Sequence, residues 1–331
     1  MKKKRIAMPL RYGINAALIV AALVIGNALV TGGALGRAQT SIVMQIGIYM
    51  ILAVSLNMAT GYLGQLPLGH AGFMAVGAYT AGIFWKSGVP IHTGTFLAGV
   101  LLAALVTGVV GILIGIPALR LKGDYLAIIT LGFGEIIRIA IINLSGLTGG
   151  APGLKTIPKQ ASFLKVYLCV TFTLMIIHMI MKSRHGRAIL SIRENEIAAE
   201  ACGIPTTYYK VMAFAVSAGF AGVAGALYAT NMGIIAPGEF GFMQSINILV
   251  MVVLGGMGSM LGSALAAGVL TALPLALQRF NEYRMVIFSA LLVVVMIFKP
   301  SGLLGTYDFS VSRILGRIMN GADTQEGGER P

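Results

Sequence analysis

Charged side chains are scarce in this chain, which has 24 Lys and Arg and 11 Asp and Glu among 331 residues, or 11%. A soluble domain ordinarily carries about 25%. The two cysteines, Cys169 and Cys202, lie in settings too different to predict a disulfide, and no metal-ligand spacing occurs. The shortage of charge excludes a soluble enzyme and a disordered protein, and the shortage of cysteine excludes a disulfide scaffold.

Motifs for nucleotide binding and catalysis are also missing. No G-x-x-x-x-G-K-[ST] phosphate loop, nucleophile elbow, zinc motif or dinucleotide fingerprint occurs. We therefore predict a chain that is not an enzyme, has no ATPase motif of its own and binds no cofactor or metal.

Apolar residues make up 57% of the sequence, more than a single soluble core of this size can bury. An apolar helix needs about 20 residues to cross a bilayer. The sequence predicts an all-α, polytopic transmembrane helical bundle of about ten spans, with eight or nine as alternatives. The predicted spans are 14–31, 41–60, 68–85, 94–119, 125–145, 164–181, 211–230, 246–259, 262–278 and 284–298. The glycines at 255–258 predict a tight turn between two short helices.

The basic residues predict the orientation. The net charge of +13 comes from clusters between apolar stretches, which favours the lipid bilayer over nucleic acid as the partner. With a cytoplasmic N-terminus, 16 Lys and Arg lie inside and 7 outside, so we predict that both termini are cytoplasmic. This gives a basic arm at 1–13, a permease domain at 14–305 and a disordered tail at 306–331. The alternative for the first helix is a cleaved signal peptide.

Five polar residues in or beside the predicted spans are candidates for a translocation path: Gln65, His70, Glu135, Arg138 and Asn247. Glu135 and Arg138 share a helical face, and each charge near a helix centre costs about 2.5–3.5 kcal/mol. They either form a pair that locks the helix or line the path. The Gly- and Pro-containing segment Gly61–His70 resembles the discontinuous segments of transporters, with an ordinary cytoplasmic turn as the alternative.

A charged cytoplasmic loop at 182–210 interrupts the apolar pattern. Within it, Glu194–Cys202 predicts a short surface helix that ends at Gly203 and Pro205. Ile197 and Ala201 lie on one side of this helix, which suits a groove on a soluble partner. A solvated linker helix is the alternative.

At this loop the sequence becomes recognisable. Ala198-Ala199-x-x-x-Gly203 resembles the coupling-helix motif Glu-Ala-Ala-x-x-x-Gly of bacterial ABC import permeases, with Ile197 in the Glu position and Glu196 before it. Longer stretches between residues 41 and 305 are similar, in order, to LivM-type permeases of branched-chain amino acid transport. These stretches are Ser55–Tyr79, Leu119–Arg138, Leu147–Gly153, Arg187–Tyr209, Leu249–Ser259 and Lys299–Gly305.

The resemblance implies a multi-pass permease subunit in a bacterial inner membrane, importing leucine, isoleucine and valine by alternating access. Its implied partners are a homologous second permease, two ATP-binding subunits that use ATP, and an extracytoplasmic amino-acid-binding protein. The implied ATPase contact falls on Ala198, Ala199 and Gly203, and we extend it to Arg193 and Glu196. The alternatives are a permease for urea, short amides or other amino acids, and an ion-coupled secondary transporter with Glu135 as the relay.

Overall fold

The computed structural model describes residues 36–276 apart from 89, 91 and 122, and the isolated positions 27, 32, 289, 293 and 297. All the helices named below belong to one compact unit, Arg37–Thr306. The predictions for the spans 14–31 and 284–298, for the N-terminal arm and for the tail fall outside the continuous described range.

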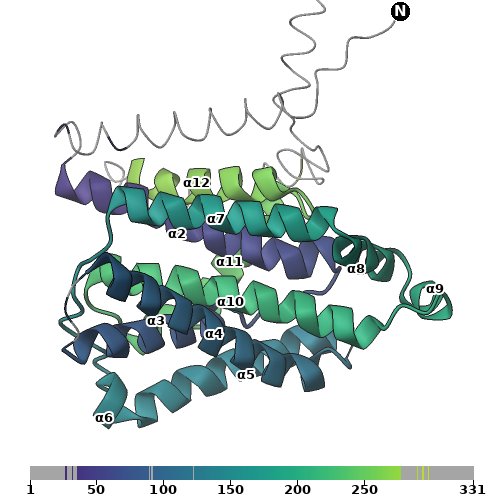
Figure 1. Cartoon of the computed structure of the whole chain (residues 1–331), viewed down its shortest axis with the longest axis horizontal. Helices are drawn as coiled ribbons and strands as arrows, with labels where there is room; N and C mark the ends of the chain where they lie inside the picture. The colour runs from purple at the N-terminus through teal and green to yellow at the C-terminus, as the bar shows by residue number, and fades with distance from the viewer. Residues whose placement is uncertain are drawn as a thin grey trace, which may run out of the picture. The chain divides into compact units, whose positions relative to one another are not determined.

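Every regular element in the described part of the chain is a helix (Figure 1). One isolated antiparallel bridge, between Leu154 and Ile235, ties two loops together. The helices are α2 (Arg37–Asn57), continued by the π-helix η1 (Met58–Tyr62), α3 (His70–Lys86), α4 (Thr93–Ala118), α5 (Asp124–Asn143), α6 (Ser145–Thr148), α7 (Phe163–Lys182), α8 (Arg184–Glu194), α9 (Glu196–Ala201), α10 (Thr206–Met232), the 3₁₀ helix η2 (Pro237–Phe240), α11 (Phe242–Gly255) and α12 (Met260–Ala276).

Five of these helices are long and apolar enough to cross a membrane, namely α2 with η1, α4, α5, α7 and α10. This confirms the predicted all-α, multi-pass class. Each of the eight spans predicted between residues 41 and 278 has a helix in the structure, but α3, α11 and α12 have only 17, 14 and 17 residues. The predicted turn is also confirmed, because α11 ends at Gly255 and α12 begins at Met260.

The centre of the bundle is built on glycine. A Cβ added to Gly77 of α3 would overlap the backbone of Gly222 in α10, and one added to Gly225 would overlap the carbonyl of Met74. Gly222 in turn faces the side chain of Thr107 in α4. Small residues let membrane helices approach closely where lipid provides no hydrophobic drive for association. Helices α3, α4 and α10 therefore pack with their backbones unusually close to one another at these glycines.

Helices α3 and α11 both begin inside the bundle. Before α3, the backbone N–H of Leu68 donates to Thr130 Oγ1 of α5 at 2.9 Å. Thr130 is six residues into α5, or about 9 Å along its axis. The N–H of Ala71 donates to Ser245 Oγ of α11 at 3.2 Å. The segment that precedes α3 therefore returns into the bundle, and the first turns of the two short helices meet there.

Candidate coupling surface and translocation path

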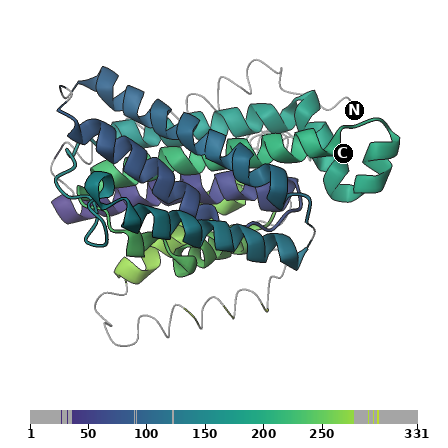
Figure 2. The ribbon, with the colours of Figure 1, turned by 90° about the horizontal axis from the view of Figure 1, so that it is seen from below.

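The predicted cytoplasmic loop folds into two short helices, α8 and α9, and α9 lies beyond the ends of the longer helices in both views (Figures 1 and 2). The Ser183 hydroxyl caps α8, and Asn195 Oδ1 caps α9 by accepting from the N–H of Ala198 at 3.1 Å. The helix predicted at Glu194–Cys202 is thus the shorter α9, preceded by a helix that the sequence interpretation did not include.

Gly203 ends α9 through its backbone conformation. It has a φ of +80°, its N–H donates to the carbonyl of Glu200 at 2.8 Å, and the N–H of Ile204 donates to that of Ala199 at 3.0 Å. A Cβ at Gly203 would meet no atom within 4 Å. The glycine is therefore suited to the left-handed conformation that reverses the chain, and space for a side chain is available.

Helix α9 is bonded to the start of α10. Lys210 Nζ lies 2.7 Å from Glu196 Oε1, and the Lys210 side chain is only 4% exposed. The Thr206 hydroxyl donates to Glu200 Oε1 at 2.6 Å. Ala199 is buried on the same side. These contacts join α9 directly to the N-terminal residues of α10.

The opposite side of α9 is open and apolar. Ile197 is 76% exposed, and Ala198 and Ala201 are exposed beside it. Of the two alanines in the recognised motif, Ala198 is therefore available to a partner, whereas Ala199 packs inward. Glu196 is directed to Lys210.

Arg193, which we assigned to the ATPase contact, reaches into the chain itself. Its Nη1 donates to the carbonyl of Gly61 at 2.9 Å, and its Nη2 donates to Glu194 Oε1 at 2.6 Å. Arg193, the penultimate residue of α8, thus connects this helix to the π-helix η1 at the end of the α2 span.

Glu135 and Arg138 form the expected pair within α5. Arg138 Nε lies 2.7 Å from Glu135 Oε2, and the two side chains are 30% and 32% exposed. Helix α5 is the least buried of the five spans, with 17% of its apolar window buried, against 61% for α10. A charged pair near the middle of a span is thus left partly uncovered.

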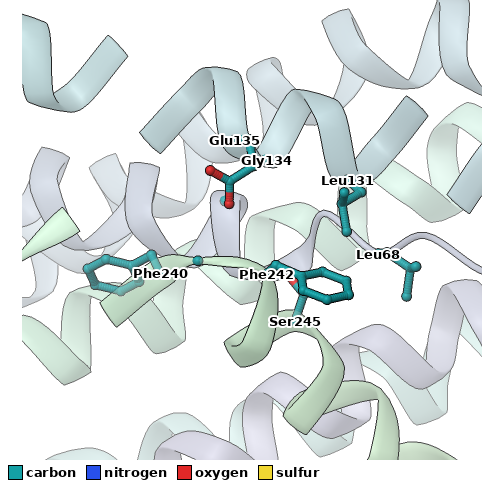
Figure 3. A pocket seen from close by; sticks show the side chains of 9 residues that line it. Leu68, Leu131, Gly134, Glu135, Phe240, Phe242 and Ser245 are labelled. Atoms are coloured by element: carbon teal, nitrogen blue, oxygen red, sulfur yellow. The ribbon is translucent and has the colours of Figure 1, made fainter. Parts of the chain in front are cut away.

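A small cavity lies beside Glu135 (Figure 3). In the figure the Glu135 carboxylate points toward the segment between Phe240 and Phe242. Gly134 and Gly72 bring α5 and α3 close together here. The nine lining residues come from the chain before α3 and from α3, α5, η2 and α11: Leu68, Gly72, Leu131, Gly134, Glu135, Phe240, Gly241, Phe242 and Ser245.

The other predicted path residues are not part of the cavity wall. His70, the first residue of α3, is buried and shares a hydrogen bond of 2.9 Å with Ser55 Oγ. Gln65 is half-buried, and its backbone N–H donates to the carbonyl of Ala59 at 3.0 Å. Asn247 is exposed and is absent from the cavity wall. The structure therefore brings Glu135 to the cavity, places Arg138 one turn away, and leaves Asn247 apart.

The carboxyl group of Glu239 lies outside the membrane-spanning helices, in η2. Burial raises the pKa of Glu239 in η2, while the hydrogen bond from the Tyr228 hydroxyl, 3.2 Å from Glu239 Oε2, acts in the opposite direction. This carboxylate lies next to Phe240 of the cavity wall.

Sequence reasoning missed several of the residues that build these sites. In the sequence, Phe240 and Phe242 look like ordinary apolar positions, and Lys210 is only one of the basic residues of the predicted cytoplasmic side. Asn57 reads as a polar residue near the end of a span, yet it is fully buried and bonded to residue 259. Only Ser245 had a signal, since polar residues cluster at the start of α11.

Comparison with known proteins agrees with this architecture. Residues 39–296 match the family described as "Branched-chain amino acid transport system / permease component". The high-affinity branched-chain amino acid transport system permease proteins LivM of Salmonella typhimurium and Escherichia coli are each 38% identical over 303 residues, covering 81% of this chain and 70% of theirs. The permease protein LivH of Escherichia coli is 28% identical over 282 residues, covering 78% of this chain and 91% of LivH.

No solved structure matches the chain. The family match covers well over half of the sequence, and the relatives are named as permease proteins, which agrees with the five helices long and apolar enough to span a membrane. The chain belongs to the family of permease components of branched-chain amino acid transport systems.

Proposed function

We propose that this permease imports leucine, isoleucine and valine across a bacterial inner membrane by alternating access, driven by ATP that separate subunits hydrolyse. The observation that carries the proposal is helix α9, which presents exposed Ile197 and Ala198 outward while Glu196 is bonded to Lys210 of a spanning helix. A chain without an ATPase motif needs such an attachment if its motor is a separate protein.

The partners in this proposal are a homologous second permease, two ATP-binding subunits and an extracytoplasmic amino-acid-binding protein. Two kinds of permease, LivM and LivH, resemble this chain, which supports a complex with two different permease subunits. The ATP-binding subunit would contact Ile197, Ala198 and Gly203, and α9 would be the part of the permease that the subunit moves. Both chain ends would be cytoplasmic, as the distribution of basic residues favours.

The proposed path runs along the uncovered face of α5 and past the cavity beside Glu135. Non-helical backbone at membrane depth is tolerated where it is buried in protein or lines a cavity, and the segment before α3 meets that condition. The first turns of α3 and α11 meet at the cavity, and the positive end of each helix dipole there favours a carboxylate. A carboxylate at Glu135 favours an ammonium group, so the surroundings suit a zwitterion with an apolar side chain.

Reconstitution tests the function. Proteoliposomes that contain the permease with its second permease and ATPase subunits should accumulate labelled leucine when ATP is inside and the loaded binding protein is outside. Accumulation of urea or a short amide in place of leucine would overturn the substrate assignment. Uptake that needs no ATPase subunit and collapses with an uncoupler would show an ion-coupled transporter instead.

A second experiment decides what the Glu135–Arg138 pair does. Glu135→Gln should lower leucine uptake about tenfold or more, because it removes the carboxylate and leaves Arg138 unpaired in a span, where a lone charge costs about 2.5–3.5 kcal/mol. If the pair only locks the helix, the neutral double variant Glu135→Gln with Arg138→Gln should recover uptake. We expect no recovery, since the path would still lack its carboxylate. Asp124→Asn, at the exposed start of α5, is the matched control and should transport normally.

A further inference from the structure

We infer that Arg193 is the positioning residue that carries movement of the coupling helices α8 and α9 to the two helix breaks at the end of α2 and between α11 and α12. The inference rests on the proposed function and adds to it the residue through which the motor reaches the bundle, beyond the direct connection of α9 to α10.

The Arg193 guanidinium bonds two groups at once. Nη1 donates to the carbonyl of Gly61 at 2.9 Å, while Nη2 and Nε donate to Glu194 Oε1 at 2.6 and 3.2 Å. The Arg193 side chain is partly exposed and Glu194 is largely exposed. A guanidinium presents its donors in a fixed planar fork, which a lysine ammonium does not. Glu194 therefore fixes the orientation of the fork, and the remaining nitrogen reaches Gly61.

The second helix break, the turn between α11 and α12, is bonded to the end of α2. The Asn57 side chain, fully buried at the end of α2, donates through Nδ2 to the carbonyl of Ser259 at 3.0 Å. Its Oδ1 accepts from the N–H of Gly258 at 2.9 Å. Asn57 therefore bonds the end of α2 to the turn between α11 and α12, and Arg193, which is bonded to Gly61, lies beside Gly258 of that turn.

Glycine backbone approaches the Arg193 side chain closely on one side. A Cβ on Gly64, whose φ is +77°, would lie 2.9 Å from Arg193 Cγ, and one on Gly258, whose φ is +87°, would lie 3.4 Å from Arg193 Nη1. A Cβ on Gly61 would overlap Asn57 Oδ1 and the N–H of Gly258. Because the backbone contacts the arginine without intervening side chains, a displacement of α8 is transferred to both breaks.

Both breaks are connected along the chain to elements that line the proposed path, the second of them from the far end of α11. The segment after η1 leads through Gly64 to Leu68, which lines the cavity beside Glu135, and α11 begins at Phe242 and Ser245 of the same wall. Movement of the two breaks therefore changes the two elements that shape the cavity.

A simpler role for Arg193 is that of a helix cap. Gly61 lies in the last turn of its helix, where carbonyls lack partners within the helix and favour a cation. A cap stabilises the protein, and its loss lowers ATP hydrolysis and uptake together. A transmitting residue differs, because its loss leaves the motor running while transport fails.

The experiment measures leucine uptake and ATP hydrolysis in the same proteoliposomes of the complete complex. In Arg193→Lys and Arg193→Gln, we expect the ATP hydrolysed per leucine imported to rise roughly fivefold or more, the scale of a typical coupling between distant sites. Glu194→Gln, at an exposed side chain, should cause a smaller rise because it frees the guanidinium. Arg187→Gln, an exposed arginine on the same helix, is the control and should leave the ratio unchanged.

The inference is overturned if the ATP hydrolysed per leucine imported is unchanged in both Arg193 variants, with uptake and hydrolysis lowered by the same factor or not at all. Arg193 would then act only as a helix cap. If Arg193→Gln fails to assemble, Arg193→Lys and Glu194→Gln decide the result in the same way. Absence of ATP-driven leucine uptake in the wild-type complex contradicts the proposed function itself, whereas normal wild-type uptake with an unchanged ratio in the variants contradicts the inference alone.

Discussion

Gly77→Val is expected to prevent recovery of a folded permease. The Cβ of the new residue would overlap the backbone of Gly222, and the three atoms nearest to it are all backbone atoms, which cannot move aside as a flexible side chain can. Adding carbon atoms to a well-packed site costs typically about 1–3 kcal/mol, and we expect at least the upper end here because the obstacle is backbone. Thermal unfolding and size-exclusion profiles of the detergent-solubilised permease measure the effect.

The control for this variant is Gly132→Val in α5. Gly132 also lies in a spanning helix, and a Cβ there would meet no atom within 4 Å. The same chemical change, with the same loss of helix flexibility, should leave a monodisperse protein with nearly the wild-type unfolding temperature. Equal unfolding temperatures for the two variants would show that the α3–α10 crossing tolerates a side chain, contrary to the packing described above.

Glu196→Gln is expected to abolish ATP-driven uptake while the protein stays in the membrane. The change leaves the Lys210 ammonium, 4% exposed, without its carboxylate. Removing one partner of a fully buried ion pair costs about 3–5 kcal/mol, and the partial exposure of Glu196 reduces this to roughly 1–3 kcal/mol. The cost falls on the connection between α9 and α10, so transport should suffer more than insertion. Uptake of labelled leucine and the amount of permease in the membrane measure the two effects separately.

The single variant Lys210→Met and the double variant Glu196→Gln with Lys210→Met complete a double-mutant cycle. In the double variant the buried ammonium is gone, so no unpaired charge remains at position 210. The double variant should therefore be more stable than Glu196→Gln alone. Lys182→Met, at an exposed lysine that ends α7, should behave as wild type. Additive losses in the double variant would mean that the two side chains act independently.

The apolar pattern predicted the helices well because it reports a local property. Each predicted span between residues 41 and 278 has a helix, and the glycines after α11 predicted the turn, since left-handed backbone at Gly256 and Gly258 favours glycine. The pattern did not predict that α3 and α11 start inside the bundle. That depends on bonds to Thr130 and Ser245, which are contributed by distant helices.

The candidate site was predictable only where the motif or the charge lay in one segment. The pairing of Glu135 with Arg138 follows from their spacing on one helix, and the surface helix α9 follows from its composition. The direction of Arg193 toward Gly61 could not be predicted, because 132 positions separate the two residues in sequence. For the same reason the inward packing of Ala199 was missed, since burial on a short helix depends on what lies beneath it.

The glycine contacts among α3, α4 and α10 have a consequence for evolution of this permease. Where helix backbones touch directly, no compensating change of a neighbouring side chain can make room for a larger residue. A larger residue at one of these contact glycines therefore has to be tolerated without help from a second substitution, whereas the exposed residues of α5 and α9 are not restricted in this way.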